Sequence, residues 1–136
     1  MMKYMLDTNT CIFAIKKNPH VLAKMLACAE GELCISSITY AELSHGVEKS
    51  SYPEKNRLAL LLFLASITIL PFDAEAAEEY GRIRADLERQ GVPIGPLDFL
   101  IGAHAKARGL VAITNNVREF CRISDLLLED WSVPSP

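Results

Sequence analysis

The sequence predicts an α/β fold in which a central, mainly parallel sheet is covered by helices on both faces. Short apolar runs rich in β-branched residues alternate with longer segments that have helical periodicity. Proline, glycine and asparagine mark the breaks between these segments, and the sequence contains no internal repeat or low-complexity linker. A chain of 136 residues has the usual length of one domain, so we expect a single domain over residues 1–136.

In the first half of the chain, helix breaks separate two apolar runs from three helical segments. The pair Asn18-Pro19 interrupts the first helical segment, and Gly31 is a suitable stop after the second. A serine after the apolar run LCIS can cap the third helix. In chain order we expect a strand at 4–6, helices at 9–17 and 19–29, a strand at 33–36, and a helix from Ser36 or Ser37 to about Lys49.

The second half continues the alternation. Pro53 suits the first turn of a helix, and the run ITIL, followed by Pro71, has the composition of a strand. Asp73 can cap the next helix, and Gly91 lies just past its expected end. In chain order we expect a helix at 53–64, a strand at 67–70, a helix from 73 to 90, a helix at 97–108, a strand at 110–114 and a short strand within 126–131.

Composition indicates a soluble cytoplasmic protein without a membrane anchor. The four cysteines form no C-x-x-C pair, which is typical of reduced thiols in the cytosol. The N-terminus lacks the apolar core of a signal peptide. The most apolar run, residues 58–70, is too short to span a bilayer, and we expect it to be the buried end of a helix that leads into a strand.

The charge balance restricts how this chain could bind nucleic acid. Its 17 acidic and 14 basic residues give a net charge of −3. A protein that binds nucleic acid only by neutralising its phosphates needs a large excess of positive charge, which this chain lacks. A nucleic-acid partner would therefore need additional help, for example from a bound divalent cation.

Four acidic residues are expected at one edge of the predicted sheet. Ligands of open α/β sheets bind outside the carboxyl ends of the strands. Asp7 directly follows the first strand, Glu42 lies in the second turn of the helix after the second strand, Asp98 begins the helix before the fourth strand, and Glu119 follows that strand. The fourth strand is also followed by Thr114, Asn115 and Asn116.

Each of these acids also has a purely structural interpretation. Asp7 could cap the helix that begins near residue 9, Asp98 could stabilise a helix dipole, and Glu119 could be a solvated loop acid. Glu42 shares a face with Ile38, at the rim of the buried stripe or partly inside it, where an unpaired carboxylate is costly. We expect His45 and His104 to be ordinary surface or core residues.

The expected convergence of the four acids favours a metal site. Clustered carboxylates repel each other, so such a pocket binds protons or a divalent cation. Oxygen ligands favour Mg²⁺ or Mn²⁺ over zinc, and Mg²⁺ takes only one or two direct carboxylates. A metal held in this way can polarise a phosphoryl oxygen and activate water for the hydrolysis of a phosphodiester.

Four motifs of the chain resemble those of the PIN-domain ribonucleases, in particular the VapC toxins of type II toxin–antitoxin pairs. They are MLDTN, SSITYAELSHG, GPLDFLIGAHA and ITNNVREF, in this order. The similarity spans residues 2–131, and four motifs with this spacing are specific although each one alone is common.

The resemblance implies a three-layer α/β/α sandwich with Mg²⁺ or Mn²⁺ in an acidic pocket. Asp7 and Asp98 would be the principal metal ligands, and Glu42 would complete the trio as a ligand or by holding a water. The substrate would be RNA, with the anticodon loop of tRNA as the target and initiator tRNA as the leading candidate. The resemblance also implies a homodimer and inhibition by a small antitoxin protein whose tail occupies the pocket.

The fourth motif departs from the pattern of many PIN domains. Where they have an acid two residues after the threonine, this chain has Asn116, and the nearest acid is Glu119. We assign Glu119 as the fourth catalytic acid and leave open whether it would touch the metal directly or through water. Asn9, Thr114 and Asn116 are expected to orient the carboxylates or the substrate.

Three other functions fit the sequence less well. Phosphohydrolases that form an aspartyl-phosphate need a second Asp at the position of Asn9 and a later lysine, but no lysine follows Lys106. A receiver domain fails for lack of the same lysine. A catalytically weak PIN-like scaffold that binds RNA or a partner is favoured only by Asn116.

Five arginines could contact phosphate groups of a nucleic acid: Arg82, Arg84, Arg89, Arg118 and Arg122. Acidic residues lie among the first three, which favours a solvated helix with ion pairs on its surface.

Overall fold

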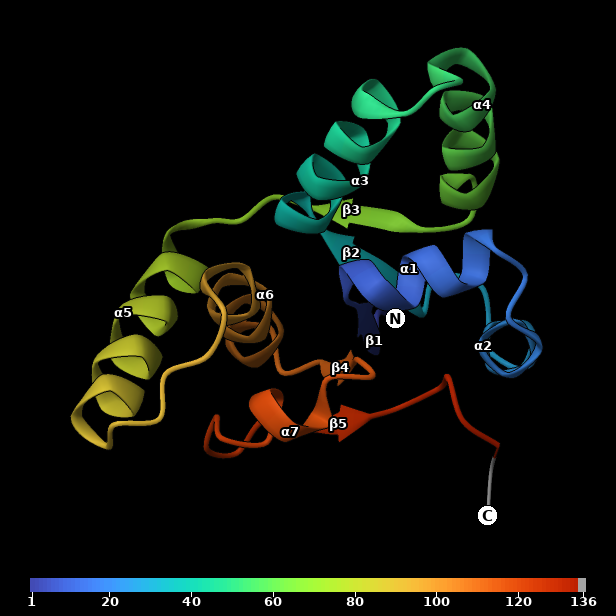
Figure 1. Ribbon diagram of the computed structural model, residues 1–136. Coiled ribbons are helices and arrows are strands. Elements are labelled where there is room, and N and C mark those ends of the chain that lie inside the picture. Colours follow the sequence, from blue (N-terminus) through green and yellow to red (C-terminus); the bar gives the residue numbers. More distant parts are fainter. Residues whose placement is uncertain (135–136) are drawn as a thin grey trace.

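The computed structural model describes residues 1–134 and contains, within them, a parallel sheet of five strands flanked by helices (Figure 1). The strands are β1 (Tyr4–Leu6), β2 (Leu33–Ser36), β3 (Thr68–Leu70), β4 (Val111–Ile113) and β5 (Leu128–Glu129). The helices are α1 (Thr8–Ile15), α2 (Pro19–Leu26), α3 (Ser37–Lys49), α4 (Pro53–Leu64), α5 (Ala74–Arg89), α6 (Pro96–Ala107) and α7 (Val117–Phe120).

The strand order β3-β2-β1-β4-β5 places β1 at the centre of the sheet. Tyr4 of β1 is in register with Leu33 of β2 on one side and with Val111 of β4 on the other. The direction in which successive strands are added therefore reverses between β1 and β4. Such a reversal opens a crevice at the carboxyl ends of the two strands, where α/β proteins place their ligands.

The two faces of the sheet are covered by different helices, because successive side chains of a strand point to opposite faces. Leu6 of β1 and Ile35 of β2 pack with helices α1 to α4. Met5 and Cys34, one position earlier in each strand, pack on the opposite face with Ala105 of α6. Helix α5 packs on the outer side of α6. The predicted fold class, a three-layer α/β/α arrangement, is confirmed (Figure 1).

Several predicted elements are longer than the observed ones. The helix expected at 9–17 ends at Ile15, because Lys17 adopts a left-handed conformation with φ of 67°. The helix expected at 19–29 ends at Leu26, and the Glu32 side chain closes the following turn by accepting a hydrogen bond from the Ala29 amide at 2.6 Å. Other boundaries move by no more than two residues, as element ends commonly do. The short helix α7 was not predicted.

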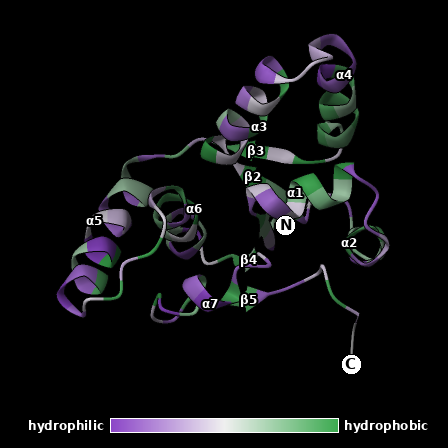
Figure 2. Ribbon diagram, viewed as in Figure 1, coloured by the Kyte–Doolittle hydropathy of each residue, from purple (hydrophilic) through white to green (hydrophobic). Residues whose placement is uncertain are grey.

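The apolar run at 58–70 is divided between α4 and β3, as expected, but it is not fully buried. Leu60 packs into the core, whereas the side chains of Leu58, Leu61 and Leu62 are 59%, 55% and 69% exposed. Figure 2 shows the second half of α4 as a hydrophobic segment. The expectation of burial is wrong for these three leucines because they lie on the outer face of the helix. Within residues 1–134, the structure contains no helix of the length and apolarity that spanning a bilayer requires.

Candidate active site

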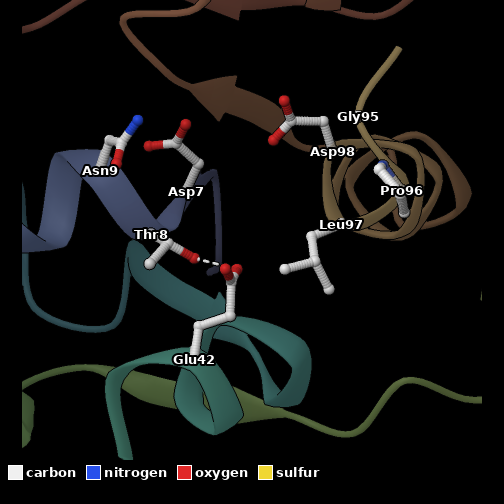
Figure 3. A pocket seen from close by; sticks show the side chains of 8 residues that line it. All are labelled: Asp7, Thr8, Asn9, Glu42, Gly95, Pro96, Leu97 and Asp98. Carbon is white, nitrogen blue, oxygen red and sulfur yellow. Dashed lines mark hydrogen bonds between the residues drawn. The ribbon is translucent and has the colours of Figure 1, made fainter. Parts of the chain in front are cut away.

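A pocket of about 270 Å³ opens where α1, α3 and the start of α6 meet (Figure 3). It lies at the carboxyl end of β1, next to the reversal in strand order. Figure 3 shows three carboxyl groups around it, from Asp7 after β1, Glu42 on α3 and Asp98 on α6. The residues that line it are Asp7, Thr8, Asn9, Glu42, Gly95, Pro96, Leu97 and Asp98. Three of the four predicted acids therefore share one pocket.

Asp7 caps a helix and also lines the pocket. Its Oδ1 atom accepts a hydrogen bond of 2.8 Å from the Thr10 amide, which caps α1. Its own amide donates to the Ile113 carbonyl of β4 at 2.9 Å, so the position of Asp7 is fixed by both strands at the switch point. The residue is 4% exposed. This burial raises the carboxyl pKa, against the opposing effect of hydrogen bonds from Thr114 and Thr10.

Glu42 is held in place by a residue that the sequence analysis missed. The Thr8 hydroxyl lies 2.6 Å from Glu42 Oε1 and donates a hydrogen bond to it, which links α1 to α3 across the pocket. Glu42 is partly buried, as expected for a carboxylate at the rim of the buried stripe of α3. The available signal for Thr8 was its position directly after Asp7, because a residue there also lies at the carboxyl end of β1.

Asp98 lies in the first turn of α6. Its pKa is raised to about 6, chiefly by burial and further by the negative charges of Glu119, Asp7 and Glu42. A hydrogen bond of 3.0 Å from Asn116 Nδ2 to Asp98 Oδ2 opposes this shift. Asp98 is therefore a carboxyl group that holds its proton more tightly than usual and whose ionised form gains from a cation beside it.

Glu119 lies beside the pocket and contacts the segment that carries Asp98. Its Oε1 atom accepts a hydrogen bond of 2.9 Å from the Gly95 amide, and its Oε2 atom accepts one of 2.6 Å from Asn116 Nδ2. These bonds, together with the positive charges of Arg122 and Arg118, lower the pKa of Glu119. The lowered pKa favours the ionised form of Glu119, and both of its carboxylate oxygens accept hydrogen bonds.

The three residues predicted to orient the site lie around it. Asn9 lines the pocket from the first turn of α1 (Figure 3). Thr114 is fully buried behind Asp7, and its hydroxyl oxygen accepts a hydrogen bond of 2.9 Å from the Asn116 amide. Asn116 donates both hydrogens of its side-chain nitrogen, one to Asp98 and one to Glu119. The histidines lie elsewhere: His45 is exposed and His104 is buried in the core.

The donor atoms at this site are all oxygens, from carboxylates and from the Thr8 and Asn9 side chains. This set suits Mg²⁺ or Mn²⁺ rather than zinc. Within residues 1–134, no three His, Cys, Asp or Glu side chains form a group that could hold a metal ion by themselves. Mg²⁺ in proteins commonly takes one or two direct carboxylates and keeps several waters, so it does not require a group of three.

The alternative phosphotransfer chemistry lacks support at this pocket. The second position after Asp7 is an amide, Asn9, which cannot act as a general acid. The last lysine of the chain, Lys106, lies 3.5 Å from Glu79 Oε1 of α5 and forms an ion pair with it. On α5 itself, ion pairs join Arg82 to Glu79 and Arg84 to Glu88, which confirms the ion-paired interpretation of this helix.

Residues 4–126 match the sequence family described as the PIN domain. The chain belongs to the PIN-domain family. The family predicted from the four sequence motifs is thereby confirmed.

Among curated relatives of this PIN domain, a tRNA(fMet)-specific endonuclease VapC from Shigella flexneri is 49% identical over 132 residues, which cover 97% of this chain and 100% of the relative. A protein of the same name from Salmonella typhimurium is 48% identical over 131 residues, covering 96% and 99% of the two chains. Their names agree with the endoribonuclease toxin predicted from the sequence.

Solved structures give the same result for the fold. The PIN domain superposes on a chain of DNA-bound VapBC from Salmonella typhimurium with a TM-score of 0.91 and 48% identity, over 96% of this chain and 99% of the other. A chain of VapBC2 from Rickettsia felis, bound to a promoter DNA fragment, gives a TM-score of 0.90 and 42% identity over the same shares.

Proposed function

We propose that this protein is the toxin of a type II toxin–antitoxin pair, a divalent-metal-dependent endoribonuclease that cleaves tRNA in the anticodon loop and thereby inhibits translation. Initiator tRNA is the leading substrate, a choice supported by the names of the VapC relatives. In this proposal residues 1–136 act as a single PIN domain in the cytoplasm. The observation that carries the proposal is the pocket that Asp7, Glu42 and Asp98 share at the switch point of the sheet.

Asp7 and Asp98 are the proposed metal ligands. Burial raises the pKa of both carboxyl groups, so each gains from a positive charge beside it. Asp7 uses Oδ1 for the α1 cap, and hydrogen bonds from Thr10 and Thr114 orient its carboxyl group beside the pocket. When bound, Mg²⁺ or Mn²⁺ would polarise a phosphoryl oxygen of the substrate and lower the pKa of a coordinated water.

The remaining residues of the pocket have roles that follow from their contacts. The hydrogen bond from Thr8 fixes one oxygen of Glu42, which leaves the other to orient a water and accept its proton. Asn9, which lines the pocket, presents an uncharged amide that can contact a phosphate without repelling it. Thr114 and Asn116 hold Asp7 and Asp98 in their orientations. Glu119 is the proposed fourth acid.

The proposed partner is a small antitoxin protein that inserts its tail into this pocket, and the toxin itself is proposed to form a homodimer. An apolar groove of about 320 Å³ between α1, α3 and α4 supports the first point, because Glu42 lines both the groove and the acidic pocket. Ile12, Leu43 and Leu60 contribute to the groove. An apolar segment in the groove could therefore extend a basic side chain toward the carboxylates. Both structural neighbours are VapBC toxin–antitoxin complexes, which also supports an antitoxin as the partner.

The experiment that tests the proposal is cleavage of purified initiator tRNA, with an elongator tRNA as the specificity control. The wild-type protein should cut the anticodon loop when Mn²⁺ or Mg²⁺ is present and stop when EDTA is added. Asp98→Asn keeps the shape of the side chain but removes its charge, and should reduce cleavage by at least about a hundredfold. Full activity of folded Asp98→Asn, or cleavage in EDTA, would contradict the proposed mechanism.

A further inference from the structure

Helix α7 and the turn after it present one polar face to the segment that carries Asp98. Residues 116 to 123 continue to wind beyond the helix, with the Arg122 amide 3.1 Å from the Glu119 carbonyl. Asn116, Glu119 and Arg122 are therefore three residues apart and lie on one side. We refer to these three residues as the polar face of α7.

All three members of this polar face bond to the segment of residues 93–98. Arg122 Nη1 donates to the Pro93 carbonyl at 2.9 Å. Glu119 Oε1 accepts from the Gly95 amide at 2.9 Å, and Asn116 Nδ2 donates to Asp98 Oδ2 at 3.0 Å. The contacts thus occur at the start, the middle and the end of the segment that delivers Asp98 to the pocket.

The opposite side of α7 is fixed against α6. A Cβ atom built on Gly102 of α6 would lie 2.5 Å from Ile123 Cδ1 and 3.5 Å from Phe120 Cε1. Phe120 is fully buried and Ile123 is 3% exposed. Glycine at position 102 leaves room for these two side chains, so α7 and the turn after it pack closely on the helix that carries Asp98.

We infer that the polar face of α7 is a positioning element for Asp98, in which Arg122 holds the preceding loop and Glu119 reaches the reaction centre only through Asn116. The inference rests on the proposed metal-dependent function. Its physical basis is the chain of contacts from the Gly95 amide to Glu119, from Glu119 to Asn116, and from Asn116 to Asp98. Both oxygens of Glu119 already accept hydrogen bonds within this chain, which favours a role in orienting a metal ligand over direct binding of the metal.

Arg122 is the new assignment, and Arg118 is its matched control. Both arginines lower the pKa of Glu119 through their charge. Of these two arginines, Arg122 donates to the Pro93 carbonyl in the part of the chain that the structure describes, whereas Arg118 is exposed to solvent. Substituting either one by alanine removes the same charge, so a difference between the two variants measures the contact with Pro93.

The test is the affinity of the full chain for Mn²⁺ alone, measured by electron paramagnetic resonance without RNA. Asn116→Ala should weaken Mn²⁺ binding by about tenfold. Arg122→Ala should weaken it by a smaller factor, Arg122→Lys should fall between this variant and the wild type, and Arg118→Ala should leave it unchanged. Thermal unfolding of the metal-free variants checks that each is folded, and only folded variants are compared.

A double-mutant cycle separates the two roles of Glu119. If Glu119 acts through Asn116, adding Glu119→Ala to Asn116→Ala should change the Mn²⁺ affinity by less than about twofold. A further loss as large as that of Glu119→Ala alone would show that Glu119 binds the metal independently, and would overturn the inference. Equal Mn²⁺ affinities of Arg122→Ala and Arg118→Ala would overturn the assignment of Arg122.

Failure of the proposed function would give a different pattern. In that case the wild-type protein would not bind Mn²⁺, or Asp98→Asn would bind it as tightly as the wild type, and the basis of the inference would be removed with it. If the wild type binds Mn²⁺ and cleaves tRNA while the cycle is additive, the proposed function stands and the inference alone is wrong.

Discussion

The Thr8 hydroxyl donates a hydrogen bond of 2.6 Å to Glu42 Oε1, and this contact joins two helices that come from separate parts of the chain. Thr8 begins α1 directly after Asp7, whereas Glu42 lies in the second turn of α3. The bond restricts the rotation of a glutamate side chain that would otherwise be free at the rim of the pocket. The geometry of the acidic trio therefore depends on a neutral residue.

Thr8→Val should reduce kcat for tRNA cleavage by about tenfold with little change in KM, because valine has the shape of threonine but cannot donate to Glu42. Thr8→Ser keeps the hydroxyl and should retain most of the activity. Single-turnover cleavage of tRNA by the two variants makes the comparison. Equal rates for Thr8→Val and the wild type would show that Glu42 needs no such restraint.

Asp98→Asn should make the metal-free protein more stable at pH 8. The folded-state pKa of Asp98 is about 6, above the ordinary value of 3.8, so the folded protein binds this proton more tightly than the unfolded chain does. The stability from this proton is fully present below about pH 3.8 and is lost as the pH rises through 6. Asparagine removes the charge, and at pH 8 the Tm should rise by a few degrees.

Calorimetry of the wild type and Asp98→Asn at pH 5 and pH 8, in EDTA, checks this prediction. The difference in Tm between the two proteins should be smaller at pH 5 than at pH 8, because at pH 5 the wild-type carboxyl is already protonated in the folded state. A variant that is less stable than the wild type at pH 8 would contradict the raised pKa of Asp98.

The fold and three of the four acids could be predicted because each depends on a local pattern. Asp7 follows the end of an apolar run, and Asp98 begins the helix that leads into the next strand. Both could therefore be assigned, without coordinates, to the edge where parallel strands end and the following helices begin. The contact between Thr8 and Glu42 joins residues 34 positions apart, and no periodicity reports which threonine faces which acid.

The region around Glu119 could not be predicted for a different reason. Helix α7 has four residues, which is about one turn and too short to show a helical period. Its place is set by packing against Gly102, a glycine that lies inside α6 and carries no turn signal. For Asp7, the sequence suggests either a helix cap or a pocket residue. The structure shows both, because one oxygen caps α1 while the carboxyl group also lines the pocket.

Protonation of His104 should destabilise the fold. His104 is fully buried; its Nδ1 atom lies 2.8 Å from Ser36 Oγ, and its Nε2 atom has no hydrogen-bond partner among residues 1–134. Burial lowers the pKa of the imidazole, and the positive charge of Arg108 lowers it further, while the negative charge of Asp73 opposes the shift. Because the folded-state pKa lies below 6.5, the stability is present above that pH and is lost as the pH falls through the folded value.

Urea unfolding from pH 7 to pH 5 measures this effect, in the Asp98→Asn background so that Asp98 does not titrate. The loss should approach, at most, about 1.4 kcal/mol per pH unit. His104→Asn in the same background can still bond to Ser36 but does not titrate here, and its stability should change less over this range. Parallel pH dependence in both proteins would assign the effect to another group.

Gly102→Ala should destabilise the protein and reduce its nuclease activity together. Alanine gains about 1 kcal/mol of helix propensity over glycine. The new methyl group would meet Ile123 Cδ1 at 2.5 Å, and the neighbouring Phe120 is fully buried and cannot move aside without cost. The clash should displace α7, and with it the contacts of Asn116 and Glu119 to the segment that carries Asp98.

Removal of the clashing atom provides the control for this variant. Ile123→Val deletes Cδ1 and should cost about 1 kcal/mol by itself. Combined with Gly102→Ala, it should be less harmful than the sum of the two single changes, because valine makes room for the added methyl group. Both the Tm and the rate of tRNA cleavage should show this recovery. Additive losses in the double variant would mean that the approach of α7 to α6 does not set the position of Asp98.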